Sequence, residues 1–159
     1  MLNQKSNSGG EAKSYWVWAQ RRTDDNGILL QQQIVTASDS QEAMAEAWDS
    51  LSDPDHWVIV FSGPIQFIAK LLQRMKEQSS MDAQLGLKHF LVIIEDSHEN
   101  MRHPGTIPAS NIHEACASVL KQFRSGLGLT PDQDKDRCRV VGAIEYSVLA
   151  KTYLAILAV

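Results

Sequence analysis

The sequence predicts a mixed α+β protein in which a single sheet is packed by about four helices. Runs of β-branched and aromatic residues alternate along the chain with segments whose apolar residues recur every three or four positions. Clusters of Pro, Gly, Asn and Asp separate these segments, as turns require. Of the 159 residues, 43% are hydrophobic and 21% charged, which is enough to bury a core without disulfides or metals. We expect one compact domain over 14–159, after a flexible polar tail at 1–13.

Charge and cysteine content exclude several classes of protein. Lys and Arg number 15 against 19 Asp and Glu, so the formal charge is −4 and the positive excess typical of nucleic-acid-binding proteins is missing. Two cysteines are too few for the disulfide framework of a small secreted protein, and the polar first residues do not resemble a signal peptide. We therefore expect a soluble, cytoplasmic protein.

The last twenty residues test this expectation. Val140–Val159 is nearly apolar, but Glu145 and Lys151 interrupt the run and no basic residues follow it. A buried strand followed by a buried helix explains such a run better than a membrane anchor does. We expect no association with membranes.

The first structured segment is predicted to be a β-hairpin. Tyr15–Ala19 and Ile34–Thr36 are rich in strand-forming residues, and Asn26-Gly27 between them is the pattern of a two-residue hairpin turn. With these two residues at the centre of the turn, the numbers of opposed residues add to 53. Trp18 then faces Val35, and the base of the hairpin is apolar while its tip is polar.

The polar end of this hairpin is the predicted recognition site. Four of its side chains carry hydrogen-bonding groups or charge and lie outside the predicted core: Arg21, Arg22, Gln31 and Gln33. Such groups pair with the backbone or the carboxylates of another molecule, and an unpaired strand edge beside them can add a strand across an interface. We expect the hairpin at 15–36 to contact a protein partner or a second copy of the chain.

A helix, a strand and a second helix are predicted to follow the hairpin. The first helix begins with a capping box at Ser38 or Asp39. A buried strand at His56–Phe61 precedes a helix that starts near Pro64. The apolar stripe of the first helix is predicted at Met44, Ala47, Trp48 and Leu51.

The second half of the chain repeats this order. Its three strands are predicted at His89–Ile94, Thr106–Ala109 and Arg139–Ile144. A polar turn region at 95–105 joins the first two strands. A helix capped by Ser110 or Asn111 is predicted to end at Gly126, and 147–159 is predicted as a helix in preference to a strand.

Two segments of the chain resemble each other. Residues 37–45 and 109–117 match at five of nine positions, and each segment lies at the start of a predicted helix. The match predicts a ββαβα unit written twice in a pseudo-two-fold arrangement, with halves at 14–80 and 86–159. Similar capping chemistry at two unrelated helix starts would give the same match, so both explanations stay open.

The segment 95–103 holds the densest cluster of groups that could carry chemistry. Carboxylate and imidazole ligands of the kind that zinc and manganese take are offered by Asp96, His98, Glu99 and His103. The two histidines are five residues apart, however, which is not the spacing of a helical metal pair, and a polar turn uses the same residue types. We predict no bound metal, with Asp96, His98 and His103 as the candidates if one is bound.

The predicted function is surface contact without catalysis. The sequence contains no nucleophile elbow, phosphate loop or zinc-protease motif, and Cys116 falls on the apolar stripe of a predicted helix. We expect a non-catalytic protein-binding module without a cofactor, such as an accessory subunit, adaptor, immunity protein or inhibitor. Two alternatives stay open: a small metal-dependent or phosphate-handling enzyme using 95–103, and a binder of single-stranded nucleic acid using Trp16 and Trp18 of the hairpin.

Overall fold

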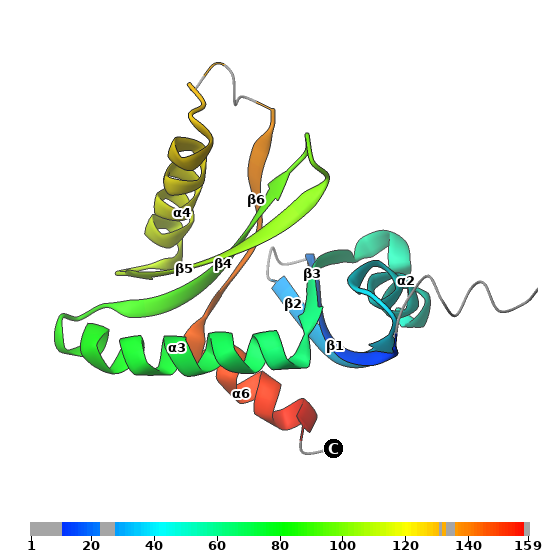
Figure 1. Cartoon of the computed structure of the whole chain (residues 1–159). Coiled ribbons are helices and arrows are strands. Elements are labelled where there is room, and N and C mark those ends of the chain that lie inside the picture. Colours follow the sequence, from blue (N-terminus) through cyan, green and yellow to red (C-terminus); the bar gives the residue numbers. More distant parts are fainter. Residues whose placement is uncertain (1–10, 23–27, 131, 133–135, 158–159) are drawn as a thin grey trace, which may run out of the picture. The chain divides into compact units, whose positions relative to one another are not determined.

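The computed structural model describes residues 11–22, 28–130, 132 and 136–157. In these residues the chain forms six strands and four α-helices, which confirms the predicted α+β class (Figure 1). The strands make two three-stranded antiparallel sheets, β2-β1-β3 (sheet 1) and β5-β4-β6 (sheet 2). The prediction of a single sheet is therefore wrong. Each half of the chain supplies a central strand, and strands of the same half occupy both of its edges.

The chain divides into two compact units, 1–70 together with 155–159, and 71–154. Sheet 1 belongs to the first unit and sheet 2 to the second, and each is described by itself. That 14–159 folds as one compact domain stays a prediction. Of the predicted tail, residues 1–10 lie outside the described residues, and Lys13 already belongs to the first strand.

Sheet 1 is built around β1 (Lys13–Arg22), which pairs with β2 (Ile28–Ala37) on one side and with β3 (Val58–Pro64) on the other. The predicted strand at His56 starts two residues later, because a short 3₁₀ helix, η1 (Pro54–His56), precedes it. After β3 the chain continues directly into α3 (Ile65–Gln84).

The hairpin formed by β1 and β2 has a different register from the predicted one. Trp18 pairs with Gln32 and not with Val35, and Arg22 pairs with Ile28, so the numbers of paired residues add to 50. Five residues separate the last pair, where the predicted turn had two. The register prediction is wrong because it took Asn-Gly as the whole turn.

This change of register reverses the faces of β2. The slip is by three residues, and an odd slip moves every side chain of a strand to the opposite side of the sheet. Val35 accordingly packs in a buried cluster with Val17 instead of facing Trp18. The predicted turn residues, Asn26-Gly27, lie outside the described residues.

Helix α2 (Ser40–Ser50) covers the Val17 face of sheet 1. The buried cluster between them comprises Tyr15, Val17, Val35, Ala37, Ala43 and Ala47. Two residues of the predicted apolar stripe, Ala47 and Leu51, are buried. The other two differ from the prediction: Ala43 is buried in place of Met44, and Trp48 is 38% exposed. Two alanines one turn apart let the helix backbone lie close to the sheet, so the larger neighbours face outward.

Sheet 2 is built around β4 (Lys88–Asp96), which pairs with β5 (Met101–Ala109) and β6 (Cys138–Glu145). The predicted polar turn at 95–105 is wrong, because only 97–100 forms the turn and β5 already begins at Met101. The predicted turn includes Pro104 and Gly105, but an edge strand accepts proline where its missing N–H faces away from the ladder.

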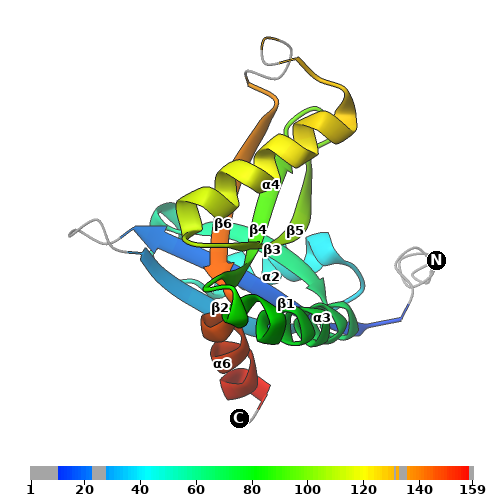
Figure 2. The same cartoon turned by 90° about the vertical axis from the view of Figure 1, so that its left-hand side faces the viewer.

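Helix α4 (Ile112–Leu127) crosses one face of sheet 2 (Figure 2). The cluster between them comprises Phe90, Val92, Ile94, Ala109, Ala115, Val119 and Cys138. The helix lies so close to β5 that a Cβ atom on Gly105 would be 2.8 Å from a methyl group of Val119. It ends at Gly128, which has a left-handed backbone (φ 69°), and not at the predicted Gly126.

The chain closes with α6 (Tyr146–Leu157), so the helix predicted for this segment is confirmed. Within the second unit, α3 and β4 are joined by a buried contact, in which His89 Nδ1 lies 2.8 Å from a carboxylate oxygen of Asp82. None of the helices in the described part of the chain combines the length and the apolar character that a bilayer crossing requires.

The two halves of the chain share one architecture. Each runs strand, strand, helix, strand, helix, and each sheet has its first strand in the centre. The ladder between the first and third strands shifts register at the same place, between Trp18 and Ala19 in β1 and between Ile93 and Ile94 in β4. These register shifts lie outside the capped segments 37–45 and 109–117. The likeness between the halves therefore extends beyond similar helix starts. The pseudo-two-fold arrangement stays a prediction.

The matching segments are the caps of α2 and α4. Asp39 and Asn111 are the N-caps, and their side chains accept the backbone N–H of Glu42 and Glu114 at 2.8 and 2.9 Å. These contacts confirm the second residue of each predicted capping pair. The preceding serines donate both backbone and side-chain hydrogen bonds to the same glutamates.

Candidate functional site

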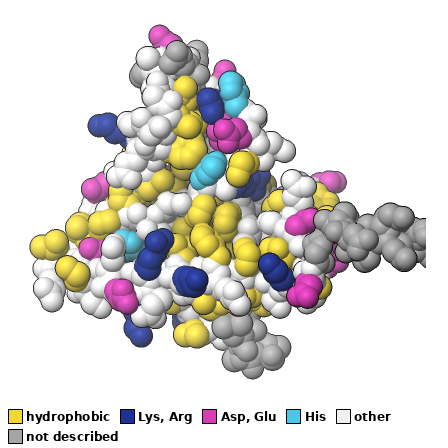
Figure 3. Space-filling model, viewed as in Figure 1, with side chains coloured by type: hydrophobic (Ala, Val, Ile, Leu, Met, Phe, Trp, Pro, Cys, Tyr) yellow, Lys and Arg dark blue, Asp and Glu magenta, His cyan; other side chains and the backbone are white. Residues whose placement is uncertain are grey.

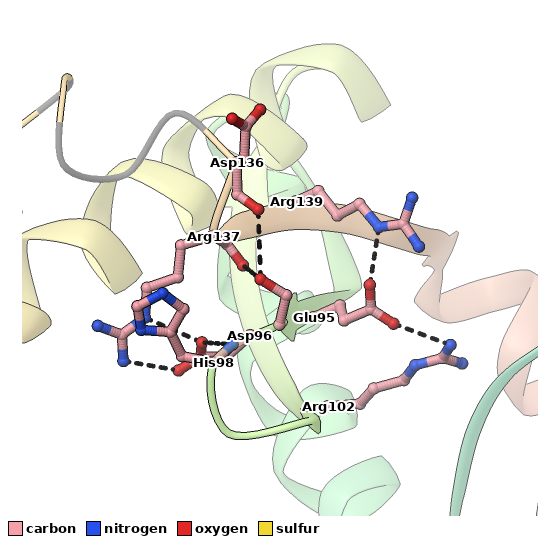
Figure 4. Close-up of polar contacts among 8 residues, drawn as sticks. Glu95, Asp96, His98, Arg102, Asp136, Arg137 and Arg139 are labelled. Carbon is pink, nitrogen blue, oxygen red and sulfur yellow. Dashed lines mark hydrogen bonds and ion pairs between the residues drawn. The ribbon is translucent and has the colours of Figure 1, made fainter.

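The charged residues of the segment 95–103 gather at the turn end of sheet 2. Glu95 and Asp96 are the last residues of β4, and successive strand residues point to opposite faces of a sheet. Figure 4 shows each carboxylate meeting arginine side chains on its own side. In the space-filling view, acidic, basic and histidine side chains lie together at this end of the sheet (Figure 3).

Asp96 is held by Arg137, which precedes β6. The guanidinium Nε donates to one carboxylate oxygen at 2.9 Å and Nη2 donates to the other at 3.0 Å. The backbone N–H groups of His98 (3.0 Å) and Glu99 also donate to this carboxylate. The hydrogen bonds from Arg137 outweigh the effect of burial and lower the pKa of Asp96 to about 2, so the carboxylate is ionised at neutral pH.

Glu95 lies on the opposite face with two other arginines. Arg139 Nε donates to one carboxylate oxygen at 2.8 Å, and Arg102 Nη2 donates to the other at 3.1 Å. Partial burial raises the pKa of Glu95, but the two guanidinium groups outweigh it and the pKa lies below its ordinary value. The turn end of β4 is thus tied to β5 and β6 by charge-assisted hydrogen bonds.

The turn at 97–100 is also bonded to the start of β6. Ser97 donates its backbone N–H to the carbonyl oxygen of Arg137 at 2.9 Å, and its hydroxyl lies within hydrogen-bond distance of the carbonyls of Asp136 and Arg137. These contacts and the Asp96–Arg137 pair close the same end of the sheet. The cluster therefore performs a structural task.

The structure rearranges the predicted metal candidates. Asp96 and His103 lie together, but the third residue of the group is Glu99, and His98 is exposed outside it. The nearest ligand atoms of Asp96, Glu99 and His103 lie within 4.8 Å of one another. His103 Nε2 is buried without a hydrogen-bond partner among the described residues, and its ring lies 4.9 Å from that of Phe123.

The state of Asp96 decides what this group can do. A carboxylate has about four lone-pair positions, and those of Asp96 receive two N–H groups from Arg137 and two from the backbone. A cation would have to displace one of these donors and would lie beside a permanent positive charge. The geometry is that of an internal ion pair with an Asx turn.

The predicted recognition residues of the hairpin lie in several environments. Arg21 is half-buried, with its guanidinium carbon 5.8 Å from the ring centroid of Trp57. Gln33 accepts a hydrogen bond from Ser50 at 3.2 Å, and Gln31 is half-buried on the same strand. The side chain of Arg22 lies outside the described residues.

The tryptophans of the hairpin belong to the core. Trp16 and Trp18 are both 0% exposed, and their ring centroids are 6.1 Å apart. Trp16 Nε1 donates to the side-chain oxygen of Gln32 at 2.9 Å. Neither indole therefore exposes a face on which a base could stack.

Strand β2 is longer than the sequence predicts, because it covers Ile28–Ala37 and the predicted strand residues are only Ile34–Thr36. It pairs with β1 alone among the described residues, so it is an edge of sheet 1. Its ten residues, Ile28–Ala37, include no charge, no proline and no glycine. Leu29 is 49% exposed and Ile34 is 37% exposed on it.

The edge strand at the same place in sheet 2 has the opposite character. β5 also pairs with one strand, but it contains Pro104, Pro108 and the charged Arg102. Charges and prolines are the residues with which proteins prevent strands from adding to an edge. Among the described residues, edge strand β5 of sheet 2 therefore carries these protecting residues, and edge strand β2 of sheet 1 carries none.

Comparisons with known proteins give no family: no model of a protein family matches the chain, and no curated protein matches it.

Proposed function

We propose that this chain is a non-catalytic protein-binding module that recognises another polypeptide by pairing it with strand β2. The observation that carries the proposal is the long, uncharged, proline-free edge of sheet 1. An extended segment laid along such an edge gains main-chain hydrogen bonds, and side-chain contacts give it specificity. An accessory subunit, adaptor, immunity protein or inhibitor can act in this way.

The side chains of β2 suit this task. Leu29 and Ile34 offer apolar surface on opposite faces of the strand, because their numbers differ by an odd count. Gln31 and Gln33, two of the predicted recognition residues, lie between them. Gln31 offers an amide donor and acceptor, whereas the side-chain oxygen of Gln33 already accepts a hydrogen bond from Ser50. The binding surface proposed here is the outer edge of β2 with these four side chains.

The chemistry at the end of sheet 2 supports binding over catalysis. Glu95 and Asp96 are engaged by arginines that hold them ionised, so neither is poised to exchange a proton near neutral pH. A general acid or base has its pKa shifted toward the working pH, and these are shifted away from it.

The test uses a matched pair of exposed positions. Leu29 in β2 and Met101 in β5 occupy the same place in their sheets and are 49% and 50% exposed. A photo-crosslinking amino acid is introduced at one position or the other in cells that produce the protein. We expect a defined polypeptide adduct from position 29, in about tenfold excess over position 101.

The adduct is then confirmed with pure components. Backbone amides of β2 should gain protection from hydrogen exchange when the crosslinked polypeptide is added, whereas those of β5 should not. Equal adducts from the two positions, or no protection of β2, would contradict the proposal.

A further inference from the structure

Residues 29–35 of β2 read the same in both directions by chemical type. Around Gln32 as the centre, residues at equal distances on the two sides match: amide with amide, then apolar with apolar. The matched pairs are Gln31 with Gln33, Leu30 with Ile34 and Leu29 with Val35. A symmetric interface between identical chains requires this kind of self-complementarity, whereas a strand that binds a different peptide does not.

We infer that β2 pairs with β2 of a second copy of this chain, antiparallel and centred on Gln32. The inference rests on the proposed function and names the polypeptide that the edge accepts. In this register each residue of 29–35 meets its matched residue of the other copy. Paired numbers add to 64, an even number, so a two-fold axis perpendicular to the sheet brings the same faces of the two sheets together.

Both faces of the joined sheet gain complementary contacts. On the face that carries Trp16 in β1, Leu30 meets Ile34 of the second copy. On the face covered by α2, Leu29 meets Val35 of the second copy, and the two glutamines face each other between these pairs. Leu29 and Ile34, the two exposed apolar residues of the edge, are both covered.

Charge also favours a second copy. β2 carries no charge, so self-pairing brings no like charges together. The same operation on β5 would put prolines along the junction and bring Arg102 into it twice. A single pair of strands is a small interface, and we expect a dissociation constant on the order of micromolar.

The experiment reverses charge across the two-fold axis. One variant carries Gln31→Lys with Gln33→Lys, and the other carries Gln31→Glu with Gln33→Glu. In either variant alone, position 31 of one copy faces a like charge at position 33 of the other, twice per dimer. Sedimentation velocity over a concentration series should show dimer affinity reduced by about tenfold or more for each variant.

An equimolar mixture of the two variants should restore association, because every lysine then faces a glutamate. Restoration also shows that both variants are folded. The register is tested with single substitutions: Gln31→Lys should associate better with Gln33→Glu than with Gln31→Glu. The charge-matched control carries Gln78→Lys with Gln122→Lys, two exposed helix positions, and should dimerise like the parent protein.

Each result decides between the two proposals. A parent protein that stays monomeric at high concentration, or a dimer that neither variant weakens, overturns the second-copy inference. A crosslink from position 29 to a different polypeptide would then still support the proposed function. Absence of any adduct at position 29 together with a monomeric parent would overturn both.

Discussion

The turn ends of the two central strands hold different chemistry on the same scaffold. Counted from the bulge, Arg21 in β1 and Asp96 in β4 occupy the same position. Arg21 lies over the ring of Trp57, whereas Asp96 forms a double hydrogen bond with Arg137. At the same position, sheet 1 thus has a cation–aromatic contact and sheet 2 has an ion pair.

What the two sheets share is what specifies the fold. The bulge, the caps of α2 and α4 and the apolar face of each central strand occur in both, and these features set register, helix start and core. The polar ends can therefore differ without a change of architecture. The two sheets also differ in where their charges lie: those of sheet 2 form ion pairs that close its own end, whereas β2 of sheet 1 contains neither charge nor proline.

The largest effect is expected where α4 and β5 pack most closely. Gly105 has Gln33 as its counterpart in sheet 1, and a Cβ at Gly105 would lie 2.8 Å from Val119. Val119 is a short, branched side chain and cannot swing aside. We expect Gly105→Gln to reduce the free energy of unfolding by about 1–3 kcal/mol, measured by urea denaturation.

A double-mutant cycle identifies the cause of that loss. If the clash with Val119 is responsible, Gly105→Gln combined with Val119→Ala should be more stable than the two separate losses predict. Strict additivity would show that the glycine is needed for its backbone and not for the close approach of the helix.

The second prediction concerns acid stability. Because the folded pKa of Asp96 is about 2 and its ordinary value is 3.8, this group stabilises the fold above about pH 4. The stabilisation is lost as the pH falls toward 2, since the unfolded chain takes up the proton first. We expect Arg137→Gln to raise the pKa of Asp96 and to flatten the dependence of stability on pH between 4 and 2.

The measurement compares melting temperatures across this range with an NMR titration of the Asp96 carboxyl. Glu42 and Glu95 also have lowered pKa values, so Asp96→Asn serves as the reference that removes this one titration. Arg21→Gln, at the equivalent place in sheet 1, should leave the profile between pH 4 and 2 unchanged. An unaltered profile in Arg137→Gln would show that the ion pair does not control the acid response.

The elements of the fold follow from local patterns, and the errors arise where distant residues decide. The caps at Asp39 and Asn111 depend on neighbours three residues away, so both were predictable. The register of β2 depends on a turn longer than its Asn-Gly pair indicates. For β5, proline indicates a turn in most contexts, and only its position at an edge makes a strand possible.

The site was predictable only in its residue types. The sequence singled out Asp96 and His103, which do lie together, but Arg137 is 41 positions beyond Asp96 and has no local signal that links them. Glu99 is one of the four possible ligands in the sequence, but the three predicted candidates include His98 in its place. The choice between the two depends on how the turn at 97–100 directs each side chain. The sequence predicted an unpaired strand edge in the hairpin. Which of the two hairpin strands forms that edge depends on where β3 pairs, and this is visible only in the sheet.

The smallest effect is expected from making the two edges alike. Pro104 and Pro108 of β5 correspond to Gln32 and Thr36 of β2, and their numbers differ by an even count, so both lack an N–H on the same side of the strand. The variant Pro104→Gln with Pro108→Thr gives β5 the donors that β2 has. We expect it to form species larger than a dimer in sedimentation velocity, through a second contact about tenfold weaker than the one proposed for β2. The contact is weaker because Arg102 remains in β5 and keeps a charge at the edge. If the variant associates no further than the parent protein, the prolines are not what protects this edge. The contrast between the two edges must then lie in the charge alone. In that case, adding Arg102→Gln to the same variant should produce the larger species.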